Sequence, residues 1–242
     1  MDSAQHCAAV IPCWDEAATI ASVVRGVRLH LPTVVVVDDG STDDTATRAR
    51  EAGAEVIRLA TNRGKGAALR VGFQHLRDRG VVWAMMLDGD GQHAPADIPS
   101  FFRCVEHTSA ALVVGNRLKQ PAAMPWLRRQ VNRWMTRRLV RLTGRPLADS
   151  QCGFRLLRLD ALAGVTLSTE HFEIESELLT ALAADGARIE FIPVQTIYKT
   201  NASKIHPMVD TWRWLRWWRT RRCEKNLTDG LPQNLLLPDP HV

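Results

Sequence analysis

The sequence predicts an α/β protein with a mostly parallel central sheet and helices on both faces. Short apolar segments alternate with helical segments through the first half of the chain, as in repeated strand–helix units. Residues 33–37 form a continuous β-branched run, which is typical of a strand covered on both faces. Acidic or glycine-rich clusters follow three apolar segments, at 38–43, 62–66 and 88–92. These clusters should meet at one sheet edge, where such sheets bind ligands.

Each element follows from its local pattern. Strands are predicted at 8–11, 33–37, 54–59, 82–87 and 112–114. Helices are predicted at 17–31, from a Ser41 or Thr42 cap through residue 50, and from the 62–66 cluster to about residue 77. In the second half we predict helices at 125–142, 172–184 and 210–222, and strands at 154–157 and 188–198, the last interrupted by Pro193. We expect a main domain at 1–205 and a C-terminal amphipathic helix and tail at 206–242, extended after Asn226.

The composition indicates a globular protein. The chain has 242 residues, of which 45% are hydrophobic and 24% charged, unlike a disordered protein. Its five cysteines show no Cys-x-x-Cys spacing, which predicts a reduced cytosolic protein without a disulfide framework or structural zinc. No apolar run approaches the roughly 20 residues that cross a bilayer, and the N-terminus does not resemble a signal peptide.

Basic residues gather in two segments. Residues 117–145 contain nine Lys or Arg and no Asp or Glu, and residues 199–225 contain eight Lys or Arg against Asp210 and Glu224. An otherwise acidic chain with two basic segments predicts an anionic partner there, whether phosphate, nucleic acid or membrane.

The predicted helix at 210–222 carries tryptophans among arginines. One side is assigned Trp212, Trp214, Leu215, Trp217 and Trp218, and the other Arg213, Arg216 and Arg219. This combination suits a bilayer interface, where the indole lies at headgroup depth and the charge meets anionic lipid. The helix at 125–142 has the same design. The alternatives are packing of the tryptophan side on the protein core, or a dimer contact.

The acidic sequence Asp-Gly-Asp-Gly-Gln-His at 88–93 directly follows a predicted buried strand. Asp88 and Asp90 stand on alternate residues freed by glycines, so both can point at one hard cation such as Mg²⁺ or Mn²⁺. An ordinary solvated turn has the same composition, and the two readings stay open on this motif alone.

Six motifs occur in a fixed order. They are Pro12 with Asp15 and Glu16, the acidic run at 37–45, Asn-Arg-Gly-Lys-Gly at 62–66, the loop at 88–93, Asp-Ser-Gln-Cys-Gly-Phe-Arg at 149–155 and Ser-Lys-Ile at 203–205. Together they resemble family-2 glycosyltransferases, and among these the dolichol- or polyprenol-phosphate mannosyl- or glucosyltransferase group, from about residue 8 to 215. The resemblance implies a GT-A (Rossmann-like) fold for 1–205, a nucleotide-sugar donor, Mg²⁺ or Mn²⁺, and inversion at the anomeric carbon.

The resemblance also implies roles for individual residues. The nucleoside pocket would be lined by Pro12, Glu16, Val37 and Asp39. The metal would be bound by Asp88, Asp90 and Gln92, with Gly89 beside the donor. Donor or acceptor phosphates would contact Arg117, Lys199 and Lys204. The catalytic residues would be Asp88, Asp90 and Arg117.

Four further residues receive weaker assignments. Asp15 stands where Asn is common in the family. For Arg63 and Lys65 we favour a turn leading into a helix over donor contact. We expect His93 to hydrogen-bond locally rather than to bind metal.

The acceptor decides whether a general base is needed. A sugar hydroxyl needs one, whereas a lipid phosphate is already ionised at neutral pH, so catalysis reduces to positioning and electrostatics. Asp149 and Glu177 match acidic positions of the family and either is a candidate for a hydroxyl acceptor. The base stays unassigned.

The leading hypothesis is a metal-dependent transfer of mannose or glucose, from GDP-mannose or UDP-glucose, to polyprenyl phosphate or another lipid acceptor. The enzyme would be peripheral on the cytoplasmic face of a membrane. Alternatives are a hydroxyl acceptor, or a nucleotidyltransferase acting on sugar phosphates, although Pro12 and its neighbours do not form the glycine-rich phosphate loop expected after the first strand. A nucleic-acid-binding protein would leave the acidic clusters unexplained, so no nucleic-acid partner is expected.

Overall fold

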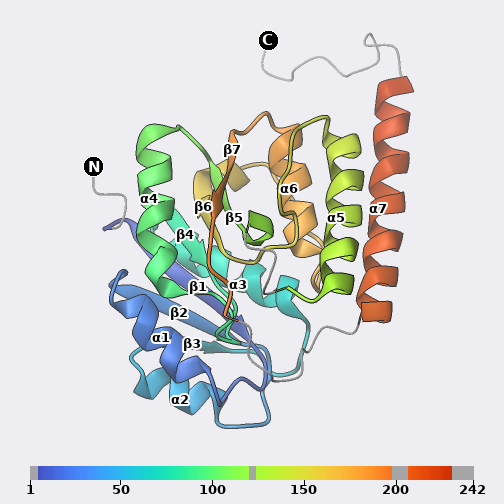
Figure 1. The fold of residues 1–242 in the computed structure, drawn as a ribbon. Coiled ribbons are helices and arrows are strands. Elements are labelled where there is room, and N and C mark those ends of the chain that lie inside the picture. The colour runs from blue at the N-terminus through green and yellow to red at the C-terminus, as the bar shows by residue number, and fades with distance from the viewer. Residues whose placement is uncertain (1–4, 120–123, 198–206, 231–242) are drawn as a thin grey trace. The chain divides into compact units, whose positions relative to one another are not determined.

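The computed structural model describes residues 5–119, 124–197 and 207–230 (Figure 1). Lys199, Lys204 and the Ser-Lys-Ile motif lie outside the described residues, as does the tail from 231 onward. The chain divides into two compact units, one ending at Asn201 and one beginning at Ala202. Each unit is described by itself.

The first half of the chain alternates strands with helices, as predicted. The strands are β1 (Cys7–Cys13), β2 (Thr33–Asp38), β3 (Glu55–Arg58) and β4 (Trp83–Met86). The helices between them are α1 (Ile20–Arg28), α2 (Thr45–Glu51) and α3 (Lys65–Asp78). The four valines of β2 at 34–37 are buried because helices cover both faces of the sheet (Figure 1).

The predicted cap of α2 is wrong. Asp44 precedes the helix and its side chain makes no capping hydrogen bond, whereas the Asp43 carboxylate accepts the Thr45 amide at 2.9 Å. The Ser41 hydroxyl instead accepts a hydrogen bond from the Asp15 amide at 2.9 Å, and the Thr42 amide donates to the Asp15 carboxylate at 2.7 Å. Both predicted caps therefore join the loop after β2 to the loop after β1.

The second half adds three strands and three helices to the first unit. The strands are β5 (Leu112–Asn116), β6 (Arg155–Arg158) and β7 (Ile189–Pro193), and the helices are α4 (Ile98–His107), α5 (Trp126–Thr143) and α6 (Ile174–Ala184). Short 3₁₀ turns lie at Pro95–Asp97, Arg117–Lys119 and Leu159–Leu162. Helix α4 was not predicted. The strand predicted to pass Pro193 ends there, because proline cannot donate to a strand ladder.

The seven strands form one mixed sheet in the order β3-β2-β1-β4-β6-β5-β7. All neighbours are parallel except β6, which runs antiparallel between β4 and β5. Helices lie on both faces (Figure 1), and the core consists mainly of side chains from β1, β2, β4, β5 and their flanking helices. The predicted mostly parallel α/β fold is confirmed.

The second unit contains α7 (Pro207–Gly230), which is longer than the predicted helix at 210–222. Trp214 and Trp218 stack with their ring centroids 6.4 Å apart. Trp212 was assigned to their side, which is wrong: two residues along a helix correspond to about 200° of rotation. The Arg216 guanidinium lies 5.9 Å from the centroid of the Trp212 ring. Trp212 therefore belongs to the arginine side of α7.

Candidate active site

Three loops meet at the carboxyl edge of the sheet, after β1, β2 and β4. In the parallel register, Pro12 of β1 lies opposite Val37 of β2, and β1 also pairs in parallel with β4. The Asp39 amide donates to the Cys13 carbonyl at 2.8 Å, which ties the first two loops together. This geometry places the acidic clusters side by side.

Gly89 lets the acidic loop lie directly against β1. A Cβ atom at Gly89 would stand 2.9 Å from the Cβ of Cys13, closer than carbon atoms normally approach. The Thr19 hydroxyl donates to the Gly89 carbonyl at 2.7 Å, and the half-buried Glu16 lies beside the same glycine. The loop after β4 is thereby held to the loop after β1.

Asp88 is held by both of its oxygens. Its Oδ1 lies 2.5 Å from the Nζ of Lys65 and its Oδ2 lies 3.2 Å from the Nε2 of His93. Burial by itself raises the pKa of Asp88, but the Lys65 charge and the His93 contact outweigh burial and hold this pKa far below its usual range. His93 thus makes the local contact expected of it, and Asp88 is ionised.

Lys65 bridges two carboxylates and was not predicted to do so. Its Nζ also lies 2.5 Å from Oε1 of Glu175, on the first turn of α6. Burial alone lowers the pKa of Lys65, yet Asp88 and Glu175 together raise it above its usual value. Sequence reasoning missed Glu175, and the sequence around Lys65 signals only a turn because glycines flank it.

Asp90 is the less constrained carboxylate of the acidic loop. Its Oδ1 accepts one hydrogen bond, from the Gln92 amide at 2.9 Å. Burial, and then the neighbouring charge of Asp88, raise the pKa of Asp90, which is the electrostatic condition that a cation relieves. The carboxylate of Asp90 and the side-chain amide of Gln92 supply the oxygen donors that Mg²⁺ and Mn²⁺ prefer.

The donor set therefore fits a divalent cation held by few protein ligands. Among residues 5–119, 124–197 and 207–230, no three His, Cys, Asp or Glu side chains converge on a metal position. Substrate phosphate and water commonly complete such a coordination shell. Asp88 would join the shell only by sharing an oxygen now engaged by Lys65 or His93.

Asp39 organises the glycine-rich loop at 62–66. Its two oxygens accept the amides of Arg63 at 2.8 Å and Gly64 at 2.7 Å. On the other side, the Glu170 carbonyl accepts the Gly66 amide at 2.7 Å. The first turn of α3, which carries Lys65, is thus fixed from two directions.

Asp15 adopts a left-handed backbone conformation with φ of +50°. Asp and Asn tolerate this region better than most residues other than glycine. Its contacts with Ser41 and Thr42 join the loop after β1 to the loop after β2. Glu16, which the sequence assigned to the nucleoside pocket, is the next residue in this loop.

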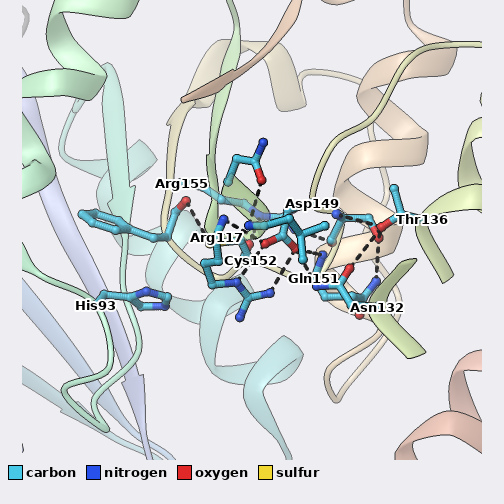
Figure 2. Close-up of polar contacts among 12 residues, drawn as sticks. His93, Arg117, Asn132, Thr136, Asp149, Gln151, Cys152 and Arg155 are labelled. Atoms are coloured by element: carbon cyan, nitrogen blue, oxygen red, sulfur yellow. Dashed lines mark hydrogen bonds and ion pairs between the residues drawn. The ribbon is translucent and has the colours of Figure 1, made fainter. Parts of the chain in front are cut away.

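Arg117 and Asp149 form a buried bidentate ion pair (Figure 2). The guanidinium contacts the two carboxylate oxygens at 2.9 and 3.0 Å, and Asn132 of α5 donates to the same carboxylate at 2.8 Å. The Asp149 side chain is fully buried. Burial alone raises its pKa, but Arg117 and the hydrogen bonds outweigh burial and lower it.

The remaining polar side chains of this network connect the 149–155 motif to two helices (Figure 2). Thr136 of α5 contacts the Ser150 hydroxyl at 2.8 Å. The Gln151 side chain donates to Ser176 of α6 at 3.0 Å. The fully buried guanidinium of Arg155 donates to the carbonyls of residues 150, 152 and 175. The sequence placed Arg155 in the 149–155 motif but gave it no role, because its partners are backbone carbonyls brought together only by the fold.

Glu177 is also fully engaged by its neighbours. Its carboxylate accepts hydrogen bonds from the amides and the hydroxyls of Ser168 and Thr169. Burial raises the pKa of Glu177, but these hydrogen bonds outweigh it and lower the pKa. Both carboxylates considered as a base are thus occupied by contacts within the protein.

The structure separates the predicted site residues into three groups. Those at the sheet edge are Pro12, Glu16, Val37, Asp39, Asp88, Gly89, Asp90 and Gln92. Val37 is fully buried. Arg117 lies in the buried ion pair. Lys199 and Lys204 form the third group, which lies outside the described residues. The phosphate contacts of these three residues stay predictions.

A mostly parallel sheet with paired carboxylates at its carboxyl edge is the arrangement expected of a GT-A glycosyltransferase, with the ligand site at that edge. The chain belongs to Glycosyl transferase family 2, whose family model matches residues 8–165. The predicted family is therefore confirmed.

Individual relatives show the same relationship. Glycosyltransferase AglJ of Haloferax volcanii is 31% identical over 186 residues, which cover 75% of this chain and 60% of that protein. The UDP-N-acetylglucosamine–dolichyl-phosphate N-acetylglucosaminyltransferase of Methanococcus voltae is 29% identical over 212 residues, covering 78% and 84%. The dolichyl-phosphate beta-glucosyltransferase of Saccharomyces cerevisiae is 26% identical over 236 residues, covering 84% and 70%.

A solved structure supports the fold. Glucosyl-3-phosphoglycerate synthase from Mycobacterium tuberculosis, in complex with Mn²⁺, UDP and phosphoglyceric acid, superposes with a TM-score of 0.69 at 18% identity, covering 94% of this chain and 79% of that one. Within the described part of the chain, no helix has both the length and the apolar character needed to cross a membrane.

Proposed function

We propose that the protein is an inverting, metal-dependent glycosyltransferase. It transfers mannose or glucose from a nucleotide-diphosphate sugar to polyprenyl phosphate or another lipid acceptor. The observation that carries the proposal is the acidic loop at 88–93, packed against the end of β1 with Asp90 and Gln92 left to bind a cation. This position at the carboxyl edge is where α/β sheets bind nucleotides.

The donor would bind across the loops after β1, β2 and β4. Pro12, Glu16, Val37 and Asp39 would surround the nucleoside. Each Asp39 oxygen accepts one backbone amide, which leaves acceptor capacity for a ribose or base donor. For Lys199 and Lys204 we propose contact with donor or acceptor phosphates.

Asp90 and Gln92 would hold Mg²⁺ or Mn²⁺. The bound ion supplies Lewis-acid stabilisation of the departing nucleoside diphosphate. Lys65 and His93 keep Asp88 ionised and oriented beside that position. The M. tuberculosis relative in fold was crystallised with Mn²⁺ and UDP, which supports metal use by this chain.

A phosphate acceptor is consistent with the state of Asp149 and Glu177, the two candidate general bases, because both are engaged by contacts within the protein. Asp149 is paired bidentately with Arg117, and Glu177 accepts hydrogen bonds from two residues. A phosphate nucleophile needs neither, because it is ionised at neutral pH. The M. voltae and yeast relatives are both named for dolichyl phosphate, which supports a polyprenyl-phosphate acceptor here.

Peripheral contact with the cytoplasmic face of a membrane would bring the enzyme to such an acceptor. Trp126 and Leu127, at the start of α5, are exposed among basic residues. Aromatic and basic side chains in this combination suit the headgroup region.

The proposal is tested by incubating the protein with Mn²⁺, polyprenyl phosphate and a panel of nucleotide sugars that begins with GDP-mannose and UDP-glucose. We expect release of nucleoside diphosphate and formation of a glycolipid, both abolished by a chelator. Transfer to soluble hydroxyl acceptors but not to polyprenyl phosphate would contradict the proposed acceptor. Synthesis of nucleotide sugar from sugar phosphate and nucleoside triphosphate would contradict the reaction class.

A further inference from the structure

The ammonium group of Lys65 is shared equally by two carboxylates from different parts of the chain. It lies 2.5 Å from Asp88, in the loop after β4, and 2.5 Å from Glu175, at the start of α6. The Lys65 side chain is 12% exposed and that of Glu175 is 4% exposed. A buried charge that loses its partner is strongly destabilising. The position of the Lys65 ammonium therefore affects the stability of both ionised carboxylates.

Glu175 has acceptor capacity that the structure does not use. Its Oε2 is buried and has no hydrogen-bond partner among the described residues. An ammonium group has three donors, so Lys65 can strengthen its contact with Glu175 without leaving it. A buried carboxylate oxygen without a partner is unfavourable. A shift of the Lys65 ammonium toward Glu175 would therefore be stabilised by a new hydrogen bond to that oxygen.

The Lys65 ammonium also lies close to Gly153 and Phe172, which crowd it on two further sides. A Cβ atom at Gly153 would stand 2.8 Å from the Lys65 ammonium and 2.7 Å from Asp88. On another side, the ammonium lies 5.7 Å from the centroid of the Phe172 ring. The backbone that carries Lys65 is fixed by the contacts of Gly64 and Gly66 described above.

Each oxygen of Asp88 already has one partner, Oδ1 the Lys65 ammonium and Oδ2 the His93 ring. A cation that binds Asp88 through Oδ1 would therefore meet the positive charge of Lys65 at contact distance. We propose that Lys65 is an internal counter-ion that occupies Asp88 when no metal is bound, and that Glu175 receives Lys65 when Asp88 turns to the metal. Both are positioning residues, and this inference rests on the metal dependence proposed above. The Lys65 charge thereby competes with the divalent cation.

The test measures binding of Mn²⁺ alone, without nucleotide, by electron paramagnetic resonance. We expect Lys65→Met to tighten Mn²⁺ binding by about tenfold or more, since it removes a competing unit charge at contact distance. Glu175→Gln should weaken binding, because Lys65 then has only Asp88 as an anionic partner. In the Lys65→Met background, Glu175→Gln should have little effect.

Two exposed substitutions control for the loss of a nearby charge. Arg63 and Glu170 form a half-exposed ion pair at 3.7 Å. Arg63→Met and Glu170→Gln should each change Mn²⁺ binding much less than the corresponding buried substitution. Additive effects of Lys65→Met and Glu175→Gln would overturn the competition, because independent charges add.

Crystals of the wild-type protein give a measurement that needs no variant. With Mn²⁺ bound at Asp90, we expect the contact between Lys65 and Asp88 to open beyond hydrogen-bond distance while that between Lys65 and Glu175 persists. Lys65 remaining on Asp88 beside bound Mn²⁺ overturns this inference and leaves the proposed function intact. Failure to bind Mn²⁺ even with UDP or GDP overturns both.

Discussion

Four aspartates near the sheet edge differ in what binds them. Asp39 holds two backbone amides, Asp88 holds Lys65 and His93, and Asp149 holds Arg117. Within the described part of the chain, the Asp90 carboxylate accepts a single hydrogen bond, from the Gln92 amide of its own loop. The same side-chain type therefore makes several tertiary contacts at three positions and a single local contact at the fourth, where we propose the cation site.

Replacement of Asp90 by alanine should lower turnover strongly with little loss of stability. The side chain is half-buried and makes one local hydrogen bond, so folding does not depend on it. Loss of an electrostatic stabiliser of the leaving group typically costs about 10²–10³ in rate. Transfer assays with Mn²⁺, alongside thermal unfolding, measure both quantities. Normal metal-dependent transfer by this variant would refute the role.

Replacement of Asp149 by asparagine should lower the free energy of unfolding by about 3–5 kcal/mol, since it leaves Arg117 buried without its counter-charge. The exposed pair of Arg158 and Asp160 provides the control, and Asp160→Asn should cost less than about 1 kcal/mol. Urea unfolding measures both. An Asp149→Asn protein with wild-type stability but no turnover would instead place Asp149 in the chemistry.

The pH dependence of stability follows from the lowered pKa of Asp149. A carboxylate whose pKa falls on folding stabilises the protein above its unfolded pKa, about 3.9 for Asp. That contribution is lost as pH falls through the folded pKa. The stability difference between wild type and Asp149→Asn should therefore be constant near neutral pH and shrink below about pH 4. Urea unfolding across pH measures it; a difference that grows in acid would contradict this sign.

Among the elements, α3 is the one whose start builds the site. The Glu170 carbonyl accepts the amides of Gly66 and Ala67, which satisfies donors that a helix N-terminus otherwise leaves free. A Cβ atom at Gly66 would stand 2.4 Å from the Thr169 carbonyl oxygen. The glycines that looked like turn residues are required because two backbone segments meet there.

Replacement of Gly66 by alanine should therefore push α3 away from the 169–171 segment. We expect a loss of about 1–3 kcal/mol, as for other overpacked sites, and weaker donor binding because Lys65 moves with the helix. Arg77→Ala, at an exposed position of the same helix, controls for general effects on α3. Wild-type stability and donor affinity in the Gly66 variant would show that the backbone yields without cost.

Helix α5 joins the buried polar network to the basic part of the chain. Asn132 and Thr136 face Asp149 and Ser150, while Trp126 and Leu127 at its start are exposed. One helix thus carries both buried contacts of the 149–155 motif and candidate membrane contacts.

At the scale of the whole molecule, charge is distributed unevenly. The two basic segments at 117–145 and 199–225 stand out against an otherwise acidic chain. Each exposed basic residue near an anionic bilayer contributes about 1 kcal/mol, reduced by salt. This distribution supports the proposed peripheral contact with membrane.

The protein should float with anionic liposomes at low salt and dissociate at high salt. Replacing Arg216, Arg219 and Arg222 of α7 by glutamine should weaken flotation, because these residues are exposed in the basic segment. The same charge change at the exposed Arg25, Arg50 and Arg77 is the control. Equal losses in both triple variants would show that only net charge matters, and no flotation at low salt would contradict membrane contact.

The sequence by itself determined the family, the order of most elements and the acidic loop. Apolar periodicity and glycine-rich breaks are local signals, so they are readable without coordinates. It missed α4, it could not show that β6 runs antiparallel, and it misplaced Trp212 on α7.

Only the tertiary structure decided which charged groups are partners. Asp88 and Glu175 are far apart in the chain, yet both contact the ammonium group of Lys65. Arg155 donates to three carbonyls, at residues 150, 152 and 175. Burial makes such contacts strong and specific, and burial depends on how distant segments pack. For this reason the sequence located the acidic loop, whereas the fold decided that Lys65 and His93 hold Asp88 while Asp90 contacts its own loop.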